Sequence, residues 1–364
     1  MSTENLSASC LDSGPTSHKM YDFPTERTES RFNFASSRHS VVLVLTSVFE
    51  AIVVIALEAV IFAKFIQHHA NEELGQGIPV YLMIFIICQV YQVGIAWDAV
   101  RMQNTIQVIA FILLNLCCLM YGSFQFQQIS EALNDIQNNN PALTSTVAMY
   151  GVDFSDLKAL IDRLLIANVI VIGLCEIIYL YLGARLYQEF GWRIYKKIGA
   201  DPEIRNMYRW YQILLTILKI DMFFFLGYSI QYLVLVLQSG DVEFPLTIIA
   251  LPLTCLFLVL AVYAVRHESK PLVLIFFVGA AAGCAYFIYK IVRIFDPTQA
   301  EKYRNIKNFL TFFASVSLAL LVLTIANIGI CWSNFKKGLK AHLLRDRSTA
   351  TLAHHAGDRM LSLD

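Results

Sequence analysis

Eight apolar stretches, separated by polar connections, take up most of this 364-residue chain. Each is long enough to cross the hydrocarbon core of a bilayer, which needs about 20 residues of helix. In hydrocarbon a backbone must satisfy its own hydrogen bonds, which a helix does within one segment. The content of charged residues, 15%, is also well below that of soluble domains. The stretches run approximately over Val41–Ile66, Pro79–Trp97, Thr105–Phe126, Leu164–Leu186, Trp210–Leu237, Phe244–Val265, Pro271–Ile291 and Phe309–Trp332.

These segments predict an all-α fold, a polytopic transmembrane helix bundle of about eight spans. Most of the 28 Lys and Arg residues fall in connections on one side of such a bundle, the side that also holds both ends of the chain. Positive connections stay in the cytoplasm, so we expect cytoplasmic N- and C-termini. The connection from Lys290 to Asn308 is basic yet falls on the other side. If a flanking segment did not span, the count would be seven and the tail would change sides.

The chain divides into three regions by composition. Residues 1–40 form a polar head, rich in Ser and Thr, which we expect to be disordered and cytoplasmic. Residues 41–332 form the transmembrane domain, and residues 333–364 form a polar cytoplasmic tail. Within the membrane domain we expect a luminal loop at about 127–163. We also expect a basic cytoplasmic helical hairpin at about 187–209, whose second helix begins at Pro202 after Asp201 as N-cap.

A layer of polar side chains is expected near the middle of the membrane. Ionisable residues are rare at that depth and usually face a bundle interior. Lys219 and Asp221 are two residues apart, about 200° around a helix, so they cannot pair with each other. We therefore expect Lys219 to pair with Glu50 or Glu176, while Glu58 lies closer to the lumen. The predicted layer consists of Glu50, Gln92, Asn115, Glu176, Lys219 and Asp221.

This layer supports two functions. Three carboxylates beside one lysine leave an excess of negative charge, so at least one should be protonated or hold a cation, as in proton-coupled carriers. Alternatively, the polar groups hydrogen-bond between helices and determine which helices pack together. A short turn between the second and third spans carries a further predicted pair, Asp98 with Arg101, at the membrane interface.

Other signals point to packing and association. Gly279 and Gly283 form a small-residue motif that favours close helix contacts, within the bundle or in a homo- or hetero-oligomer. The basic hairpin is a candidate surface for a cytosolic protein, and the lipid bilayer is the other expected partner. With a net charge of zero, nucleic acid is not expected as a partner. The sequence contains no catalytic or metal-site motif in a supporting context, so we expect no enzyme activity, metal or cofactor.

Three stretches carry a resemblance to a known family. They are FEAIVVIALEAVIF from Phe49, WDAVRMQNTIQ from Trp97, and the run from Arg193 to Leu237 that contains YKKIGADPEIRNMYRWYQ. They resemble an uncharacterised family of fungal multi-span proteins known as Golgi apparatus membrane proteins. The resemblance implies a location in the Golgi apparatus or a related endomembrane. It assigns no catalytic residue, because the family has no assigned activity.

Three classes of function remain open. The first expectation is a non-enzymatic scaffold or trafficking component whose polar layer holds the bundle together. The alternative is a proton- or small-solute-coupled transporter or channel-like protein that uses Glu50, Glu176, Lys219 and Asp221. A seven-span receptor would need the N-terminus outside, which the charge distribution disfavours.

Overall fold

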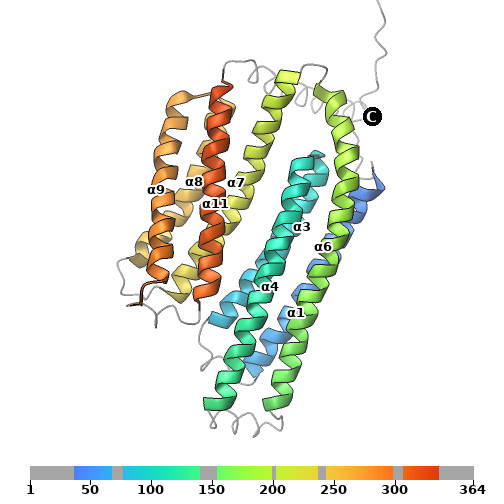
Figure 1. Cartoon of the computed structure of the whole chain (residues 1–364), viewed down its shortest axis with the longest axis vertical. Coiled ribbons are helices and arrows are strands. Elements are labelled where there is room, and N and C mark those ends of the chain that lie inside the picture. Colours follow the sequence, from blue (N-terminus) through green and yellow to red (C-terminus); the bar gives the residue numbers. More distant parts are fainter. Residues whose placement is uncertain are drawn as a thin grey trace, which may run out of the picture. The chain divides into compact units, whose positions relative to one another are not determined.

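Each of the eight apolar segments forms one long α-helix in the computed structural model, which confirms the predicted all-helical bundle (Figure 1). The structure describes residues 37–67, 77–139, 154–198, 202–236, 243–297 and 306–335. The predicted polar head and tail lie outside these residues except at 37–40 and 333–335. The helices are α1 (Arg38–Gln67), α3 (Gly77–Met102), α4 (Thr105–Asn139), α6 (Phe154–Ile198), α7 (Pro202–Leu235), α8 (Glu243–Arg266), α9 (Lys270–Ile294) and α11 (Lys307–Ser333).

Seven of these helices are long and apolar enough to cross a membrane: α1, α3, α4, α6, α7, α9 and α11. In α8 the apolar stretch found among the described residues, Leu251–Arg266, is shorter. Successive helices run in opposite directions, so α1 begins and α11 ends at the same end of the bundle (Figure 1). That parity agrees with an even number of crossings. The side of the membrane on which this end lies stays a prediction.

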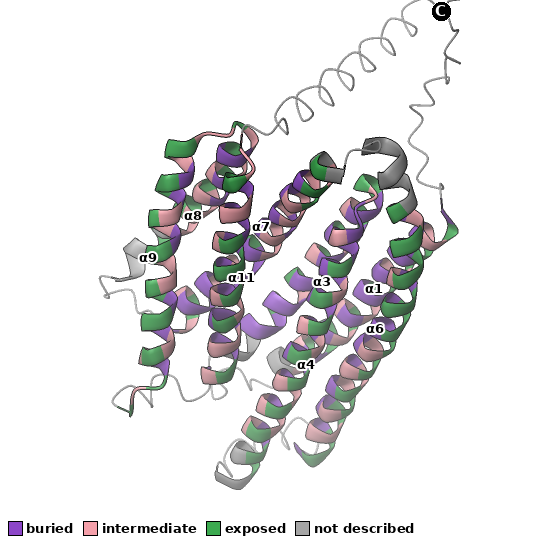
Figure 2. Ribbon diagram, turned by 45° about the horizontal axis from the view of Figure 1, so that its top comes forward, coloured by how far each residue is buried: buried purple, intermediate pink, exposed green. Residues whose placement is uncertain are grey.

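Exposed residues lie along the outer faces of the helices (Figure 2). Many of them are large and apolar, as expected for surfaces that face lipid. On α1 they include Phe49 and Ile52, and on α6 they include Leu174 and Ile177. A soluble protein would rarely expose contiguous apolar surface on this scale. The arrangement therefore requires a hydrocarbon environment around the bundle.

The helices pack as two sets. The N-terminal set comprises α1, α3, α4 and α6, and the C-terminal set comprises α7, α8, α9 and α11. Helix α7 joins the sets because it also packs against α3 and α4. Aromatic rings line this junction: Tyr91 stacks on Phe223 with centroids 4.8 Å apart, and Tyr81 lies 4.1 Å from Phe309.

The predicted luminal loop at 127–163 is largely helical. Helix α4 continues to Asn139 and α6 begins at Phe154, so only 140–153 lies outside the described residues. The two extensions share a separate hydrophobic cluster that includes Ile129, Leu133 and Ile161. The apolar residues of this stretch recur at helical spacing, which predicts helices. They were not recognised as such because most of the intervening side chains are polar. Helix α6, at 45 residues, is about 70 Å long and must project beyond a core of about 30 Å.

Two tight turns lie at the end where α1 begins. Gln103, with φ 49°, ends α3 in the left-handed conformation, and Glu268, with φ 51°, ends α8 in the same way. In the first turn the Asn104 N–H donates to the Ala99 carbonyl at 3.1 Å, and in the second the Ser269 N–H donates to Ala264 at 3.0 Å. Both turns are Schellman motifs. Such motifs usually have glycine at the left-handed position, where this chain has Gln103 and Glu268.

The two glycines of the small-residue motif pack inside this chain. A methyl group at Gly279 would overlap the ring of Phe257 on α8, and one at Gly283 would lie 3.0 Å from Leu321 on α11. Their small size thus allows α9 to approach its neighbours closely. Association with another chain through them stays a prediction.

Candidate functional site

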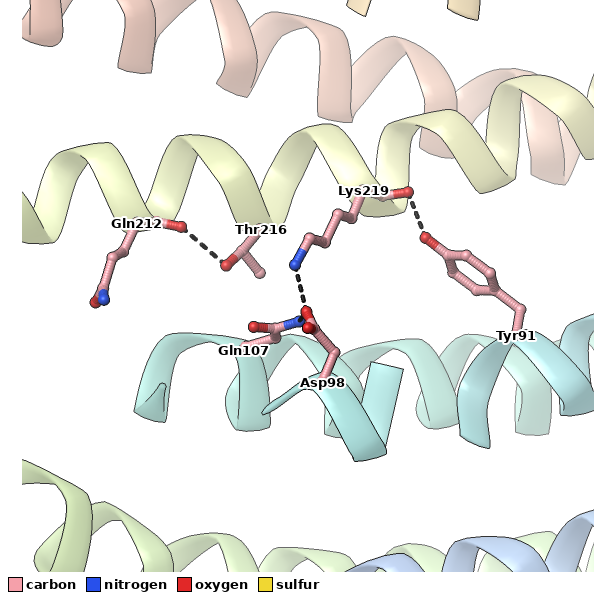
Figure 3. A network of polar contacts seen from close by, with 6 residues as sticks. All are labelled: Tyr91, Asp98, Gln107, Gln212, Thr216 and Lys219. Carbon is pink, nitrogen blue, oxygen red and sulfur yellow. Dashed lines mark hydrogen bonds and ion pairs between the residues drawn. The ribbon is translucent and has the colours of Figure 1, made fainter. Parts of the chain in front are cut away.

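Lys219 pairs with Asp98 of α3, so the predicted pairing with Glu50 or Glu176 is wrong (Figure 3). Glu50 and Glu176 project from α1 and α6, whereas α7 faces α3 and α4 at this point. Position along the helices alone does not say which helix is the neighbour, and the depth of these residues in a membrane stays a prediction. The second prediction for this segment holds: Lys219 and Asp221 do not pair with each other.

The Lys219–Asp98 pair joins the two helix sets. Gln107, near the start of α4, also donates from Nε2 to the Asp98 carboxylate. The Tyr91 hydroxyl of α3 donates to the backbone carbonyl of Lys219 at 2.6 Å, which adds a second polar contact between α3 and α7 (Figure 3). The Lys219 and Asp98 side chains are 41% and 34% exposed, so the pair lies at the edge of the bundle. The charge of Arg101 also acts on Asp98, and their direct pairing stays a prediction.

Four members of the predicted layer do gather inside the N-terminal set. Gln92 of α3 donates from Nε2 to Asn115 Oδ1 of α4, and Asn115 Nδ2 donates to Glu176 Oε2 of α6 at 2.9 Å. Glu50 of α1 accepts a hydrogen bond from the Tyr179 hydroxyl. The charge of Glu176 also acts on Glu50. These contacts connect all four helices of the set through buried side chains.

A second polar group, centred on Glu58, is absent from the predicted layer. Its carboxylate is completely buried and accepts hydrogen bonds from two amides. Gln125 Nε2 of α4 lies 3.0 Å from Oε2, and Asn168 Nδ2 of α6 lies 2.6 Å from Oε1. The available signal was the presence of Gln125 and Asn168, two amides near the ends of apolar segments that were predicted to be luminal.

Asp221 and Lys290 are the buried charged residues that the structure places in the C-terminal set. Asp221 is 4% exposed and lies close enough to Cys284 of α9 for its charge to act on that thiol. Within the described part of the chain, no hydrogen bond to the Asp221 carboxylate is found, although its oxygens are not among the fully enclosed atoms that lack a partner. Lys290, expected in a connection, belongs to α9 and is 4% exposed. Its ammonium donates to the Tyr232 hydroxyl at 2.6 Å and lies 4.1 Å from that ring's centroid.

Two spaces lie between the described helices, and neither is lined by a buried carboxylate. A void of about 10 Å³ lies among the side chains of Cys88, Cys118 and Tyr121, at the lower limit for one water molecule. A larger cavity, about 340 Å³, lies at the end of the bundle where α4 and α7 begin. Among the described residues no group of three His, Cys, Asp or Glu side chains is placed to hold a metal ion.

Sequence comparisons place these features in a family. The chain is 30% identical to UPF0658 Golgi apparatus membrane protein C23H3.04 of Schizosaccharomyces pombe, over 84% of this chain and 90% of the relative. A domain of unknown function, DUF7789, matches residues 198–334, the part that holds α7 to α11. No solved structure matches the chain.

Proposed function

This chain belongs to the UPF0658 family of Golgi apparatus membrane proteins, and from that premise we propose a non-enzymatic scaffold or trafficking role. In this role the buried polar groups hold the helix bundle together, and the basic hairpin at about 187–209 presents a cytoplasmic docking surface. The location in the Golgi membrane follows from membership of the family, whereas the role there is what we propose.

The Glu58 group is the observation that carries the structural part of this proposal. One carboxylate from α1 accepts hydrogen bonds from α4 and α6, and all three side chains are buried. A carboxylate that carries protons or solutes needs a path to water, whereas Glu58 is completely buried and lines neither the void of about 10 Å³ nor the larger cavity. Buried polar groups that bond between helices serve packing, although the carbonyl oxygens of Gln125 and Asn168 have no partner in the described residues.

A second candidate function, proton or small-solute coupling, is favoured by Asp221. Of the four residues named for transport, Glu50, Glu176 and Lys219 are engaged by Tyr179, Asn115 and Asp98. Asp221 is buried without a hydrogen bond in the described residues. An intramembrane carboxyl of this kind is a functional candidate by default.

The two candidates differ in what neutral substitutions do to the Golgi lumen. We expect Glu50→Gln, Glu176→Gln, Lys219→Met and Asp221→Asn to leave luminal pH unchanged, as measured with a pH-sensitive fluorescent protein in intact cells. Glu131→Gln, at an exposed carboxyl of the α4 extension, is the matched control. A variant that folds, reaches the Golgi and still shifts luminal pH would support coupling and refute the purely structural role.

The docking part needs a separate test. Lys196→Gln with Lys197→Gln removes two charges from the hairpin, and Lys336→Gln with Lys337→Gln removes two from the tail. If the hairpin docks a cytosolic protein, proximity labelling from the Golgi-resident chain loses specific cytosolic proteins only in the hairpin variant. Equal labelling by both variants and the parent would remove the hairpin from the proposal.

A further inference from the structure

Cys88 of α3 and Cys118 of α4 face each other within a regular contact between these two helices. The helices run antiparallel, and hydrogen bonds cross their interface on both sides of the two cysteines (Figure 1). The register of α3 against α4 therefore brings the cysteines together independently of their own contact. The bonded pairs that flank them are Gln92 with Asn115 and Tyr81 with Tyr121.

The two sulfur atoms are close enough to react with each other. Both residues are free cysteines, and their sulfurs lie 2.7 Å apart. That separation is short even for a hydrogen bond between nitrogen and oxygen, which are smaller atoms. The sulfurs of a disulfide lie about 2.05 Å apart, so a combined shift of about 0.7 Å would bond Cys88 to Cys118. Such a bond would relieve the close contact with little movement of either helix.

The surroundings of the pair restrict what can react with it. Cys88 and Cys118 are 7% and 2% exposed, and both line the void of about 10 Å³. A space of that size excludes bulky oxidants such as oxidised glutathione, because it is at the lower limit for one water molecule. Hydrogen peroxide, a small and uncharged two-electron oxidant, is the class of reagent nearest to that size.

Gln92 orients the thiol of Cys118 for the second step of such an oxidation. The Cys118 S–H donates to Gln92 Oε1 at 3.5 Å, which holds its proton away from Cys88. The lone pairs of the Cys118 sulfur are then left to face the Cys88 sulfur. Cys88 is accordingly the thiol that the oxidant meets first, and Cys118 is the thiol that captures the product.

We propose that Cys88 and Cys118 are a redox pair, which a peroxide converts to a disulfide between α3 and α4. In the first step the Cys88 sulfur bonds one peroxide oxygen, the O–O bond breaks, and the thiol proton leaves with the other oxygen as water. In the second step the Cys118 sulfur bonds the Cys88 sulfur, the S–O bond breaks, and the Cys118 proton leaves with that oxygen as water. Two thiols and one hydrogen peroxide thus give one disulfide and two water molecules.

The disulfide would fasten α3 to α4 about one helical turn from the bond between Gln92 and Asn115. A cross-link of this kind stabilises a fold because it restricts the unfolded chain. The enclosure that slows the oxidation also protects the product, since reduction requires a thiolate to reach one of the two sulfurs. The pair lies outside the hydrogen bonds of Glu58, so the inference does not depend on the scaffold or the transport role.

The test uses the full chain in nanodiscs, reduced with a phosphine and then incubated with hydrogen peroxide. After the peroxide is removed, the chain is denatured, its free thiols are alkylated, and peptide mass spectrometry locates each cysteine. We expect a linked pair of peptides that contain Cys88 and Cys118, lighter by two hydrogen atoms than the two separate peptides. The unfolding temperature of the oxidised chain should rise by several degrees.

Two variants separate the disulfide from a general effect of peroxide. Cys118→Ser should lose both the linked peptides and the rise in unfolding temperature. Cys331→Ser is the matched control, because Cys331 is a buried thiol of α11, 4% exposed, that does not line the void. This control should keep both the link and the rise.

The peptide map of the parent chain decides the proposal without any variant. Alkylation of both Cys88 and Cys118 after peroxide would overturn it. A sulfinic acid at Cys88 would also overturn it, because that product forms when no second thiol captures the first one. A link from Cys88 to the neighbouring Cys117 would refute the pairing proposed here. A Cys88–Cys118 link already present in the chain isolated without reductant would support it.

Discussion

The N-terminal and C-terminal helix sets hold their helices together by different means. In the N-terminal set, carboxylates of α1 and α6 accept hydrogen bonds from amides and a tyrosine of neighbouring helices. In the C-terminal set, the Ser317 and Thr324 hydroxyls of α11 are buried without a partner in the described residues. There α7 and α11 meet through rings such as Phe224 and Phe313, with centroids 5.5 Å apart.

This difference shows two solutions to one problem. Lipid tails are as apolar as a helix surface, so burial of apolar residues drives helix association only weakly in a membrane. Hydrogen bonds between helices and close packing of small residues against large ones are the remaining forces. The carboxylate–amide bonds lie in the N-terminal set, whereas α7 and α11 meet by close packing, as Gly227 against Phe313 illustrates. Each set also uses the other force, since Lys290 of α9 bonds Tyr232 of α7 and Gly183 of α6 packs against Ile112 of α4.

The largest effect is expected from Glu58→Ala in the N-terminal set. The change leaves the buried amides of Gln125 and Asn168 without their acceptor, and each orphaned group is unfavourable by about 1–3 kcal/mol. Reversible unfolding in mixed micelles should therefore show a loss of about 2–4 kcal/mol. Ser317→Ala removes a buried hydroxyl of the C-terminal set that has no such partner, and its free energy of unfolding should hardly change. Equal losses would abolish the distinction between the sets.

Gly227→Ala tests the packing of the C-terminal set. Its added methyl group would overlap the ring of Phe313, and overpacking of this kind typically lowers stability by about 1–3 kcal/mol. Gly329→Ala on α11 is the matched control, because nothing lies within 4 Å of the added carbon there. The control should be neutral or slightly stabilising, as alanine favours helix. The same unfolding measurement checks both, and a neutral Gly227→Ala would contradict close packing at this contact.

The contact between the sets should respond less. The Lys219–Asp98 pair is partly exposed, so a double-mutant cycle of Lys219→Met and Asp98→Asn should give a coupling of about 0.5–1 kcal/mol. A coupling well above that range would mean that the two sets depend on this pair, and a value of zero would leave the aromatic junction as their main contact.

The smallest effect is expected at the two turns. Gln103→Gly and Glu268→Gly each relieve a left-handed residue, and each should raise the unfolding free energy by about 1 kcal/mol or less. Glu268→Gly should gain less than Gln103→Gly, because Glu268 also takes part in a further interaction, although both turns use the same motif. A loss of stability in Gln103→Gly, followed in the unfolding measurement, would contradict strain at this left-handed residue.

Much of the candidate site could be predicted residue by residue. The sequence predicts that one group of polar residues lies together, because polar side chains buried at the same depth of a membrane require hydrogen-bond partners. The group consists of Glu50, Gln92, Asn115 and Glu176. Glu58 was predicted to lie closer to the lumen than the polar layer. Its partners Gln125 and Asn168 were not predicted, because the search considered mainly ionisable residues. Lys290 was assigned to a connection, since a lysine near the end of an apolar run more often marks a boundary than a buried contact with a tyrosine.

The sequence by itself determined that this chain is a membrane helix bundle built from eight apolar segments, and that Lys219 and Asp221 face apart. Those properties follow from hydropathy and helical periodicity, which act within one segment. Only the tertiary structure decided that Lys219 meets Asp98, that α4 and α6 extend beyond the predicted loop, and that Glu58 joins three helices. Such contacts depend on which helices are neighbours and how each is rotated, and neither property is encoded within a single segment.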